Sequence, residues 1–176
     1  MSEGKKSHRP AVSGVNGLVT AGHPLASMAG LRILMAGGNA IDASVAVLAT
    51  LNVVRPQMSG AGGNGFLTYF DKKSGGVHSL TAAGAAPNAL VASEREAEEL
   101  NKGIYAGVVP GLLGGWISML REYGTMSLSE VLMPALEYAE NGHPLEASVV
   151  QAIESQQELF RRYPSSARSF LPGNQV

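Results

Sequence analysis

Hydrophobic residues recur at helical spacing in two consecutive stretches, residues 24–35 and 40–54. The first stretch has one apolar face, which predicts a helix that packs on one side. The second is apolar almost all round, with Asp42 as its one charged residue, which predicts a helix buried on most sides. The Gly-Gly-Asn sequence at residues 37–39 is expected to end the first helix and start the second.

A strand pattern follows these two helices. Residues 66–71 and 77–81 have the composition of strands, and the polar, glycine-containing stretch between them predicts a β-hairpin. A further short strand is expected at residues 17–21. We place an N-terminal tail at residues 1–16 and treat residues 17–176 as one unit.

The second half of the chain predicts helices. Ser127 and Glu130 have the spacing of a capping box, so a helix is expected to begin there. Pro134 should kink this helix or delay its start. Two other helices are expected at residues 112–122 and 145–161, and a loop at residues 172–176.

The composition indicates a surface that something else covers. The chain has the length of one domain, with 176 residues, and only 15% of them are charged, against about 25% in a typical soluble domain. This deficit suggests a partner chain or missing sequence over part of the surface. The net charge of −1 gives no electrostatic reason to expect nucleic acid or an acidic membrane as a partner. Without cysteine, thiolate catalysis and zinc–thiolate sites are excluded.

No targeting segment is evident in the sequence. The first ten residues are polar and basic, and no apolar run of signal-peptide length follows them. The longest apolar stretch, residues 40–54, is too short to span a bilayer. We therefore expect a cytoplasmic protein that does not bind membranes.

The most unusual local feature is a glycine-rich stretch at residues 59–65, in which Gly60, Gly62 and Gly65 have the spacing G-x-G-x-x-G. A dinucleotide site needs a strand before these glycines and a helix after them. Here a predicted helix precedes the stretch and a predicted strand follows it. The context therefore argues against a nucleotide and favours a tight helix-to-strand connection.

Few residues suggest catalysis or metal binding. His23, at a helix start, could be a base, although a turn residue is the commoner role there. His78 and His143 show no metal-ligand spacing, so we expect no metal site and no cofactor. Asp42 must meet hydrogen-bond donors if it is buried. We expect it to cap the turn after residues 37–38 rather than to act in catalysis, and Asp71 to be a solvated turn residue.

No obvious nucleophile is present either. No serine lies in a G-x-S-x-G elbow. Ser2 could become a terminal nucleophile if Met1 were removed, but it lies in a polar tail.

Several ordered motifs resemble one family. The N-terminal ones are His23-Pro24-Leu25-Ala26-Ser27, Gly37-Gly38-Asn39-Ala40-Ile41-Asp42-Ala43 and Ser59-Gly60-Ala61-Gly62-Gly63-Asn64-Gly65-Phe66. The later ones are Val109-Pro110-Gly111 with Trp116, Tyr123-Gly124, Pro134-Ala135 and Ala139-Glu140-Asn141-Gly142. Over about residues 17–173, the chain resembles the N-terminal part of the large subunit of the gamma-glutamyltranspeptidases.

This resemblance implies an α+β fold and an enzyme class. The family consists of N-terminal-nucleophile hydrolases with an αββα sandwich, of which this chain would supply the N-terminal helices and part of the sheet. A precursor cuts itself into a large and a small subunit. The new N-terminal threonine of the small subunit attacks an amide carbonyl with its own α-amine as base, and the acyl group passes to water or an amine.

The cleavage segment of the family has no counterpart here. No threonine lies in a sequence like that cleavage segment. The threonines considered are Thr20, Thr50, Thr68, Thr81 and Thr125. The resemblance therefore implies a chain that is inactive alone, with no catalytic residue of its own. Its expected partners are a small subunit that bears the N-terminal threonine, in a heterodimer, and a small-molecule amide substrate.

A departure from the family concerns the substrate. Transpeptidases have a pattern like Arg-Glu-x-Ala-Pro after the second strand, whose arginine holds the α-carboxylate of the glutamyl group. Anchored on Pro87, that arginine position falls on Ala83, with Gly84 in place of the acid. The bidentate pairing of arginine with a carboxylate is lost, and Arg55 and Arg95 lie well away in sequence.

Three hypotheses remain open. The first is the large-subunit portion of an amide hydrolase or acyltransferase with an unknown acyl group, which need not be gamma-glutamyl, since the family also contains cephalosporin acylases and oxamate amidohydrolase. The second is a true gamma-glutamyltransferase that acts in glutathione metabolism. The third is a non-catalytic subunit with a structural or binding role.

Overall fold

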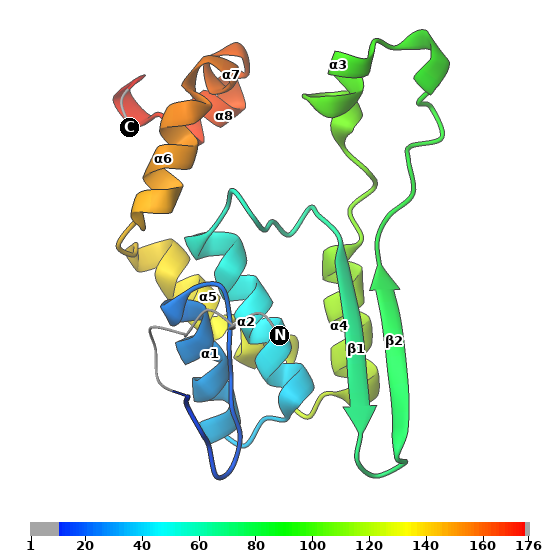
Figure 1. Ribbon diagram of the computed structural model, residues 1–176, viewed down its shortest axis with the longest axis vertical. Helices are drawn as coiled ribbons and strands as arrows, with labels where there is room; N and C mark the ends of the chain where they lie inside the picture. Colours follow the sequence, from blue (N-terminus) through cyan, green and yellow to red (C-terminus); the bar gives the residue numbers. More distant parts are fainter. Residues whose placement is uncertain (1–10, 175–176) are drawn as a thin grey trace, which may run out of the picture.

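The computed structural model describes residues 11–174, and Figure 1 shows how its elements are arranged. Helices α1, α2 and α5 form one group, α4 and a two-stranded hairpin lie beside them, and α3 and α6 to α8 extend beyond them at one end. The longer elements are α1 (Pro24–Met35), α2 (Ala40–Val54), β1 (Gly65–Asp71), β2 (Gly76–Ala82), α4 (Leu112–Tyr123) and α5 (Leu128–Asn141). The shorter ones are η1 (Ala92–Glu94), α3 (Ala97–Asn101), η2 (Ile104–Ala106), α6 (Ala147–Ser155), α7 (Gln157–Arg162), α8 (Pro164–Phe170) and η3 (Pro172–Asn174).

Helix α1 begins and ends where the sequence predicts. His23 is the N-cap, and its Nδ1 accepts a hydrogen bond of 3.1 Å from the backbone N–H of Leu25. Pro24 occupies the first turn, where no intrahelical donor is needed. After the helix, Gly37 has a φ of +95°, which an L side chain rarely adopts, and this turn leads directly into α2.

Helix α2 is also confirmed with its predicted bounds. Asn39 and Asp42 form a capping box, in which each side chain accepts a hydrogen bond from the other residue's backbone N–H. The helix packs against both α1 and α5. It also contacts α4, and packing on three sides explains why it is apolar almost all round.

The predicted hairpin is present with regular antiparallel register. Gly65 pairs with Ala82 at one end and Asp71 with Gly76 at the other. The Asp71 carboxylate accepts hydrogen bonds from the backbone N–H groups of Lys73 and Ser74, so this residue holds the turn as expected of an exposed turn residue.

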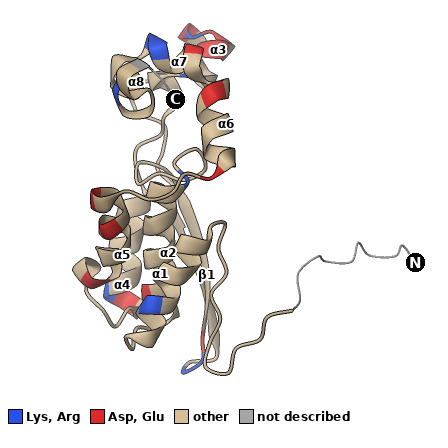
Figure 2. Ribbon diagram, turned by 90° about the vertical axis from the view of Figure 1, so that its left-hand side faces the viewer, with Lys and Arg blue, Asp and Glu red and all other residues tan. Residues whose placement is uncertain are grey.

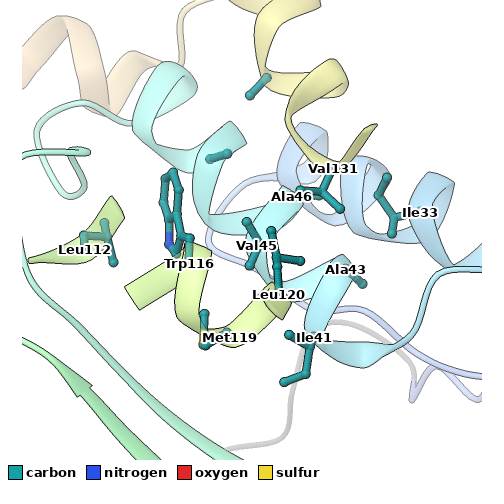
Figure 3. Close-up of a cluster of buried hydrophobic side chains, with 12 residues drawn as sticks. Ile33, Ile41, Ala43, Val45, Ala46, Leu112, Trp116, Met119, Leu120 and Val131 are labelled. Atoms are coloured by element: carbon teal, nitrogen blue, oxygen red, sulfur yellow. The ribbon is translucent and has the colours of Figure 1, made fainter. Parts of the chain in front are cut away.

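The main core lies between α2, α4 and α5. Figure 3 shows Val45 of α2 and Leu120 of α4 side by side, with Trp116 and Val131 in the same cluster. Burying an aliphatic side chain of this size stabilises a fold by roughly 1.5–3 kcal/mol. The cluster consists of Ile33, Ile41, Ala43, Val45, Ala46, Ala49, Leu112, Trp116, Met119, Leu120, Val131 and Ala135.

The two faces of the hairpin differ in how they are covered. Leu67, Tyr69 and Leu80 pack against the core cluster. On the opposite face, Phe66 and Val77 are 77% and 67% exposed. Charged residues lie mainly on the helices and at the hairpin turn (Figure 2), and the strands carry only Asp71 at the end of β1.

One predicted strand is wrong. Residues 17–21 are extended but form no strand in the described part of the chain. A strand exists only through hydrogen bonds to a neighbouring strand, and none lies beside this segment within residues 11–174. Of the predicted tail at residues 1–16, residues 1–10 lie outside the described residues. Residues 11–16 form no helix or strand.

A late start of the helix that contains Pro134 and a single helix over residues 145–161 are both wrong. Helix α5 begins at Leu128 with Ser127 as its cap, so Pro134 does not delay its start, and the proline lies fully buried inside the helix. The helix predicted at residues 145–161 is divided at Gln156 into α6 and α7. This division turns α7 so that Phe160 stacks on Phe170 of α8, with 5.1 Å between the ring centroids.

The C-terminal stretch is partly helical. The predicted loop at residues 172–176 begins with the 3₁₀ turn η3, and residues 175–176 lie outside the described part. Within residues 11–174, no helix has the length and apolarity to cross a membrane.

Candidate functional site

Three segments meet at the end of the hairpin where β1 begins and β2 ends. They are the glycine-rich loop at residues 59–65, the stretch after β2 at residues 82–87 and the stretch before α4 at residues 107–111. The Gly63 carbonyl accepts hydrogen bonds from the backbone N–H groups of Gly111 at 3.4 Å and Leu112 at 3.1 Å. The loop therefore caps α4, whose N-cap Gly111 has no side chain to do so.

This arrangement decides how the G-x-G-x-x-G spacing is used. Helix α2 precedes the loop and β1 follows it, as predicted. The Gly63 carbonyl lies at the N-terminus of α4, where an anion could otherwise bind, and accepts from the N–H groups of Gly111 and Leu112. The loop is thus a helix-to-strand connection in this structure.

The glycines of the loop differ in what surrounds them. A Cβ on Gly65 would lie 2.4 Å from Leu112 Cδ1, so this position is closed by the chain's own packing. A Cβ on Gly60 or Gly62 would meet no atom within 4 Å, and neither residue has a left-handed φ. Those two glycines border open space.

The loop is fastened to the end of α2 by one side-chain pair. The hydroxyl of Ser59 donates to Asn52 Oδ1 at 2.5 Å. Asn52 Nδ2 and Thr50 Oγ1 are buried and have no hydrogen-bond partner within residues 11–174, as is also true of Trp116 Nε1. Buried polar atoms are nearly always paired in native proteins, so the C-terminal end of α2 is unusual.

Ala83 and Gly84 lie directly beside this loop. A Cβ on Gly84 would lie 1.6 Å from the Val109 carbonyl oxygen. The backbone N–H of Val109 donates to the carbonyl of Ala85 at 3.0 Å. Two backbone segments therefore run in close contact here, and an acidic side chain at position 84 has no room.

The side chain of Ala83 is exposed. It carries no group that could pair with a carboxylate. That Ala83 and Gly84 border the substrate stays a prediction from the resemblance.

His23 and Arg55 serve to join helices. His23 is buried, with Nδ1 bonded to Leu25 and Nε2 3.4 Å from Glu146 Oε1. Arg55 donates to the Gly22 carbonyl at 2.8 Å and lies 3.9 Å from the other Glu146 oxygen. The role of His23 as a turn residue is supported, since both of its ring nitrogens already have neighbours.

Asp42 has the structural role that was expected and also a longer-range one. Besides its bond from Asn39, its carboxylate accepts hydrogen bonds from Thr125 Oγ1 at 2.6 Å and from the backbone N–H groups of Thr125 and Met126. Burial disfavours the ionised form of Asp42, but these hydrogen bonds together outweigh it and hold the pKa of this carboxyl below its usual value. Asp42 therefore ties the start of α2 to the loop between α4 and α5.

The other sequence candidates are not brought together. His78 packs with Tyr69 and Tyr123 in an aromatic cluster, at centroid distances of 6.3 and 5.4 Å. Nδ1 of His143 lies near the carbonyl of Pro144. Ser2 lies outside the described residues. Among residues 11–174 no three histidine, aspartate or glutamate side chains are grouped so that they could hold a metal ion.

The threonines remain dispersed as well. Thr50 is buried in α2, and Thr20, Thr68, Thr81 and Thr125 are exposed on four different segments. Sequence reasoning missed the pairs Asn52–Ser59 and Arg95–Tyr105. Neither pair has a local spacing signal, because each is formed by a loop folding back.

Comparisons with known proteins identify the family. A family model described as gamma-glutamyltranspeptidase matches residues 26–176. The glutathione hydrolase proenzyme of Bacillus subtilis (strain 168) is 37% identical over 171 residues, which cover 92% of this chain and 29% of that protein. The acylase ACY 1 proenzyme of Pseudomonas sp. (strain V22) is 38% identical over 180 residues, which cover 95% of this chain and 32% of that protein.

A solved structure agrees with the sequence matches. The gamma-glutamyltranspeptidase of Helicobacter pylori has a TM-score of 0.83 at 34% identity, covering 90% of this chain and 47% of that chain. The present chain spans 29% to 32% of the length of the two curated relatives named above. It supplies the N-terminal helices and part of the sheet of the αββα sandwich. The chain therefore belongs to the gamma-glutamyltranspeptidase family, as the N-terminal part of the large subunit.

Proposed function

We propose that this chain is the large-subunit portion of an amide hydrolase or acyltransferase whose nucleophile is the N-terminal threonine of another polypeptide. The observation that carries the proposal is the family match over residues 26–176. The relatives named above are described as proenzymes, and this chain corresponds to only part of their length.

In the proposed reaction, the threonine hydroxyl adds to the amide carbonyl while its own α-amine takes the proton. That proton passes to the leaving amine, and an ester remains on the threonine. Water or an acceptor amine then attacks the ester, which releases the acyl group and restores the hydroxyl. The 176-residue chain would contribute substrate binding and the walls of the site.

The exposed apolar face of the hairpin supports a partner polypeptide. Phe66, Phe70 and Val77 on this face are all at least 60% exposed. A groove of about 750 Å³ runs between residues 16–20 and β1, with side chains of α1 and α2 also lining it. We propose that strands of the partner fill this groove and cover the hairpin face, since residues 17–21 and the outer edge of β1 would then both be paired.

The site around Ala83 supports a substrate other than a gamma-glutamyl amide. The residue has no charge, and the contact between Gly84 and Val109 leaves no room for the acid of the family pattern. Identity alone does not separate the candidates, because a glutathione hydrolase and an acylase match this chain at 37% and 38%.

Two other functions stay open as proposals. A true gamma-glutamyltransferase is favoured by the glutathione hydrolase match, and it would need a carboxylate contact from elsewhere. A non-catalytic subunit would keep the same fold and partner surface without any turnover.

The first experiment is native purification of the chain from its source, with mass spectrometry of whatever polypeptide accompanies it. We expect a polypeptide with an N-terminal threonine. A preparation that contains none would contradict both enzyme proposals.

The second experiment measures hydrolysis of gamma-glutamyl p-nitroanilide by the native complex. We expect little turnover, and an increase with Ala83→Arg. The matched control is Ala139→Arg, which places the same charge on an exposed position of α5. Robust turnover by the unaltered complex would show that the argument from Ala83 is wrong.

A further inference from the structure

A second concavity lies in the excursion between β2 and α4. It has a volume of about 410 Å³, within the range of roughly 300–1,000 Å³ that is usual for small-molecule sites. Its walls are mostly apolar and include Pro87, Leu90, Ile104, Tyr105 and Val109. One cationic side chain, Arg95, also lines it.

Backbone hydrogen bonds connect the segments that form this pocket. The N–H of Val109 bonds to the Ala85 carbonyl at 3.0 Å, and the N–H of Leu90 bonds to the Pro87 carbonyl at 2.9 Å. Gly103, with a φ of +83°, makes the turn into η2, which carries Tyr105. The pocket therefore belongs to a loop with internal hydrogen bonds.

Arg95 is exposed, and its guanidinium lies over an aromatic ring. Its guanidinium carbon lies 4.3 Å from the centroid of the Tyr105 ring. A guanidinium that stacks by its face keeps the N–H donors at its edge available for a planar carboxylate. Within residues 11–174, Arg95 pairs with no carboxylate, whereas Arg32 pairs with Glu137 and Arg55 with Glu146.

Acidic neighbours do not close this site. Glu94 and Glu96 flank Arg95 in sequence but are exposed and do not line the pocket. Glu99 bonds to the N–H of Glu96 in the capping box of α3. Salt screens exposed charges of this kind. They reduce the attraction of Arg95 for an anion only in part, and neither Glu94 nor Glu96 pairs with the guanidinium within residues 11–174.

The pocket lies near the position that the family uses for its carboxylate contact, because Val109 borders both. Val109 touches Gly84 through its carbonyl, bonds to Ala85 through its N–H, and lines the pocket. One residue therefore separates Ala83 and its neighbour from the cavity that contains Arg95.

We propose that this pocket binds an apolar, carboxylate-ended group of the amide substrate, with Arg95 as the partner of the carboxylate. The proposal rests on the function proposed above and names a substrate class for it. Apolar walls suit a hydrocarbon chain, and a guanidinium stacked on Tyr105 suits bidentate pairing. A neutral amide of the same length would lose that pairing.

The test measures binding without turnover. Hexanoate and hexanamide are titrated into the ¹⁵N-labelled full chain, alone and in its natively purified complex, while the amide signals of Tyr105 and Gly107 are followed. We expect hexanoate to bind about tenfold more tightly or better, as for a charge-assisted hydrogen bond. Arg95→Gln should abolish the difference, and Arg95→Lys should keep part of it.

The control variant is Arg121→Gln, an exposed arginine of α4 outside the pocket, which should leave both affinities unchanged. Circular dichroism of each variant shows whether it is folded. Equal binding of acid and amide, or hexanoate binding that survives Arg95→Gln, would overturn the proposal.

A third outcome would also overturn it. If hexanoate does not bind the complex and the signals of residues 104–110 shift only when the partner is present, this surface is a subunit interface. Absence of a threonine-bearing partner would instead contradict the proposed function, since the acid-to-amide ratio is measured without catalysis.

Discussion

The two ends of α2 differ in how the chain satisfies their polar groups. At the N-terminal end, Asn39 and Asp42 cap the helix, and Asp42 also accepts hydrogen bonds from three donor groups of the loop that contains Thr125. At the C-terminal end, Thr50 Oγ1 and Asn52 Nδ2 are buried without a partner in residues 11–174. One end is complete within this chain, and the other is not.

This difference suggests that the N-terminal end of α2 serves the stability of the chain and the C-terminal end its proposed function. A buried polar group without a partner costs about 1–3 kcal/mol, so a chain keeps such groups mainly where another molecule or a functional requirement compensates. The incomplete end lies next to the glycine loop, where Gly60 and Gly62 border open space. We therefore expect substitutions at the N-terminal end to change stability and those at the C-terminal end to change assembly or activity.

The largest expected effect is that of Asp42→Ala. The change removes the acceptor for the N–H of Asn39, for the N–H and hydroxyl of Thr125 and for the N–H of Met126. We expect a loss of about 3 kcal/mol or more in the free energy of unfolding, measured by urea denaturation. Asp71→Ala, in the exposed hairpin turn, is the control and should have a much smaller effect; equal losses would contradict the comparison.

The same carboxylate predicts a dependence of stability on pH. Its pKa in the folded state lies below the usual value of 3.8. Asp42 therefore contributes fully above that value, and its contribution is lost as the pH falls through the folded-state pKa. The stability difference between the unaltered chain and Asp42→Asn should narrow between pH 6 and pH 3. A difference that stays constant over this range would show that the ionised form has no special role.

Two glycines at the end of the hairpin where β1 begins should differ in how a change to alanine affects stability. A Cβ on Gly84 would lie 1.6 Å from the Val109 oxygen, so Gly84→Ala should cost about 1–3 kcal/mol through forced separation of the two backbones. Gly62→Ala meets no atom within 4 Å and should leave the chain's stability unchanged or slightly higher.

Assembly gives the second measurement for this pair. If the partner approaches the glycine loop, Gly62→Ala should weaken copurification of the partner while the chain's own unfolding curve stays the same. A normal yield of complex would show that the open space beside Gly62 does not mark a contact.

Local signals explain which elements the sequence predicted well. Three signals act over only a few residues: the Ser127–Glu130 capping box, the glycines after α1 and the polar hairpin turn. The helices and strands that begin or end at these signals were predicted. The exposed position of Ala83 agrees with a role at the surface, although its link to the substrate comes from family resemblance alone.

Long-range pairing explains what the sequence could not predict. Asp42 and Thr125 are 83 residues apart, and no periodicity connects them. The strand expected at residues 17–21 had a suitable composition, but a strand depends on a neighbour, and the described chain provides none. Arg95 appeared too distant in sequence to matter, and only the folding of residues 87–110 into a pocket places it beside Tyr105 and Val109.

The smallest expected effects come from the same substitution at the two ends of α2. Thr125→Val removes the hydroxyl that donates to Asp42 at 2.6 Å, which should cost about 1.5 kcal/mol because the acceptor is charged. Thr50→Val removes a buried hydroxyl that has no partner within residues 11–174, so stability should be unchanged or rise by up to about 1 kcal/mol. Urea denaturation of both variants at neutral pH measures the difference. If Thr50→Val is as destabilising as Thr125→Val, the Thr50 hydroxyl is satisfied in solution, and the two ends of α2 are more alike than their intramolecular hydrogen bonds indicate.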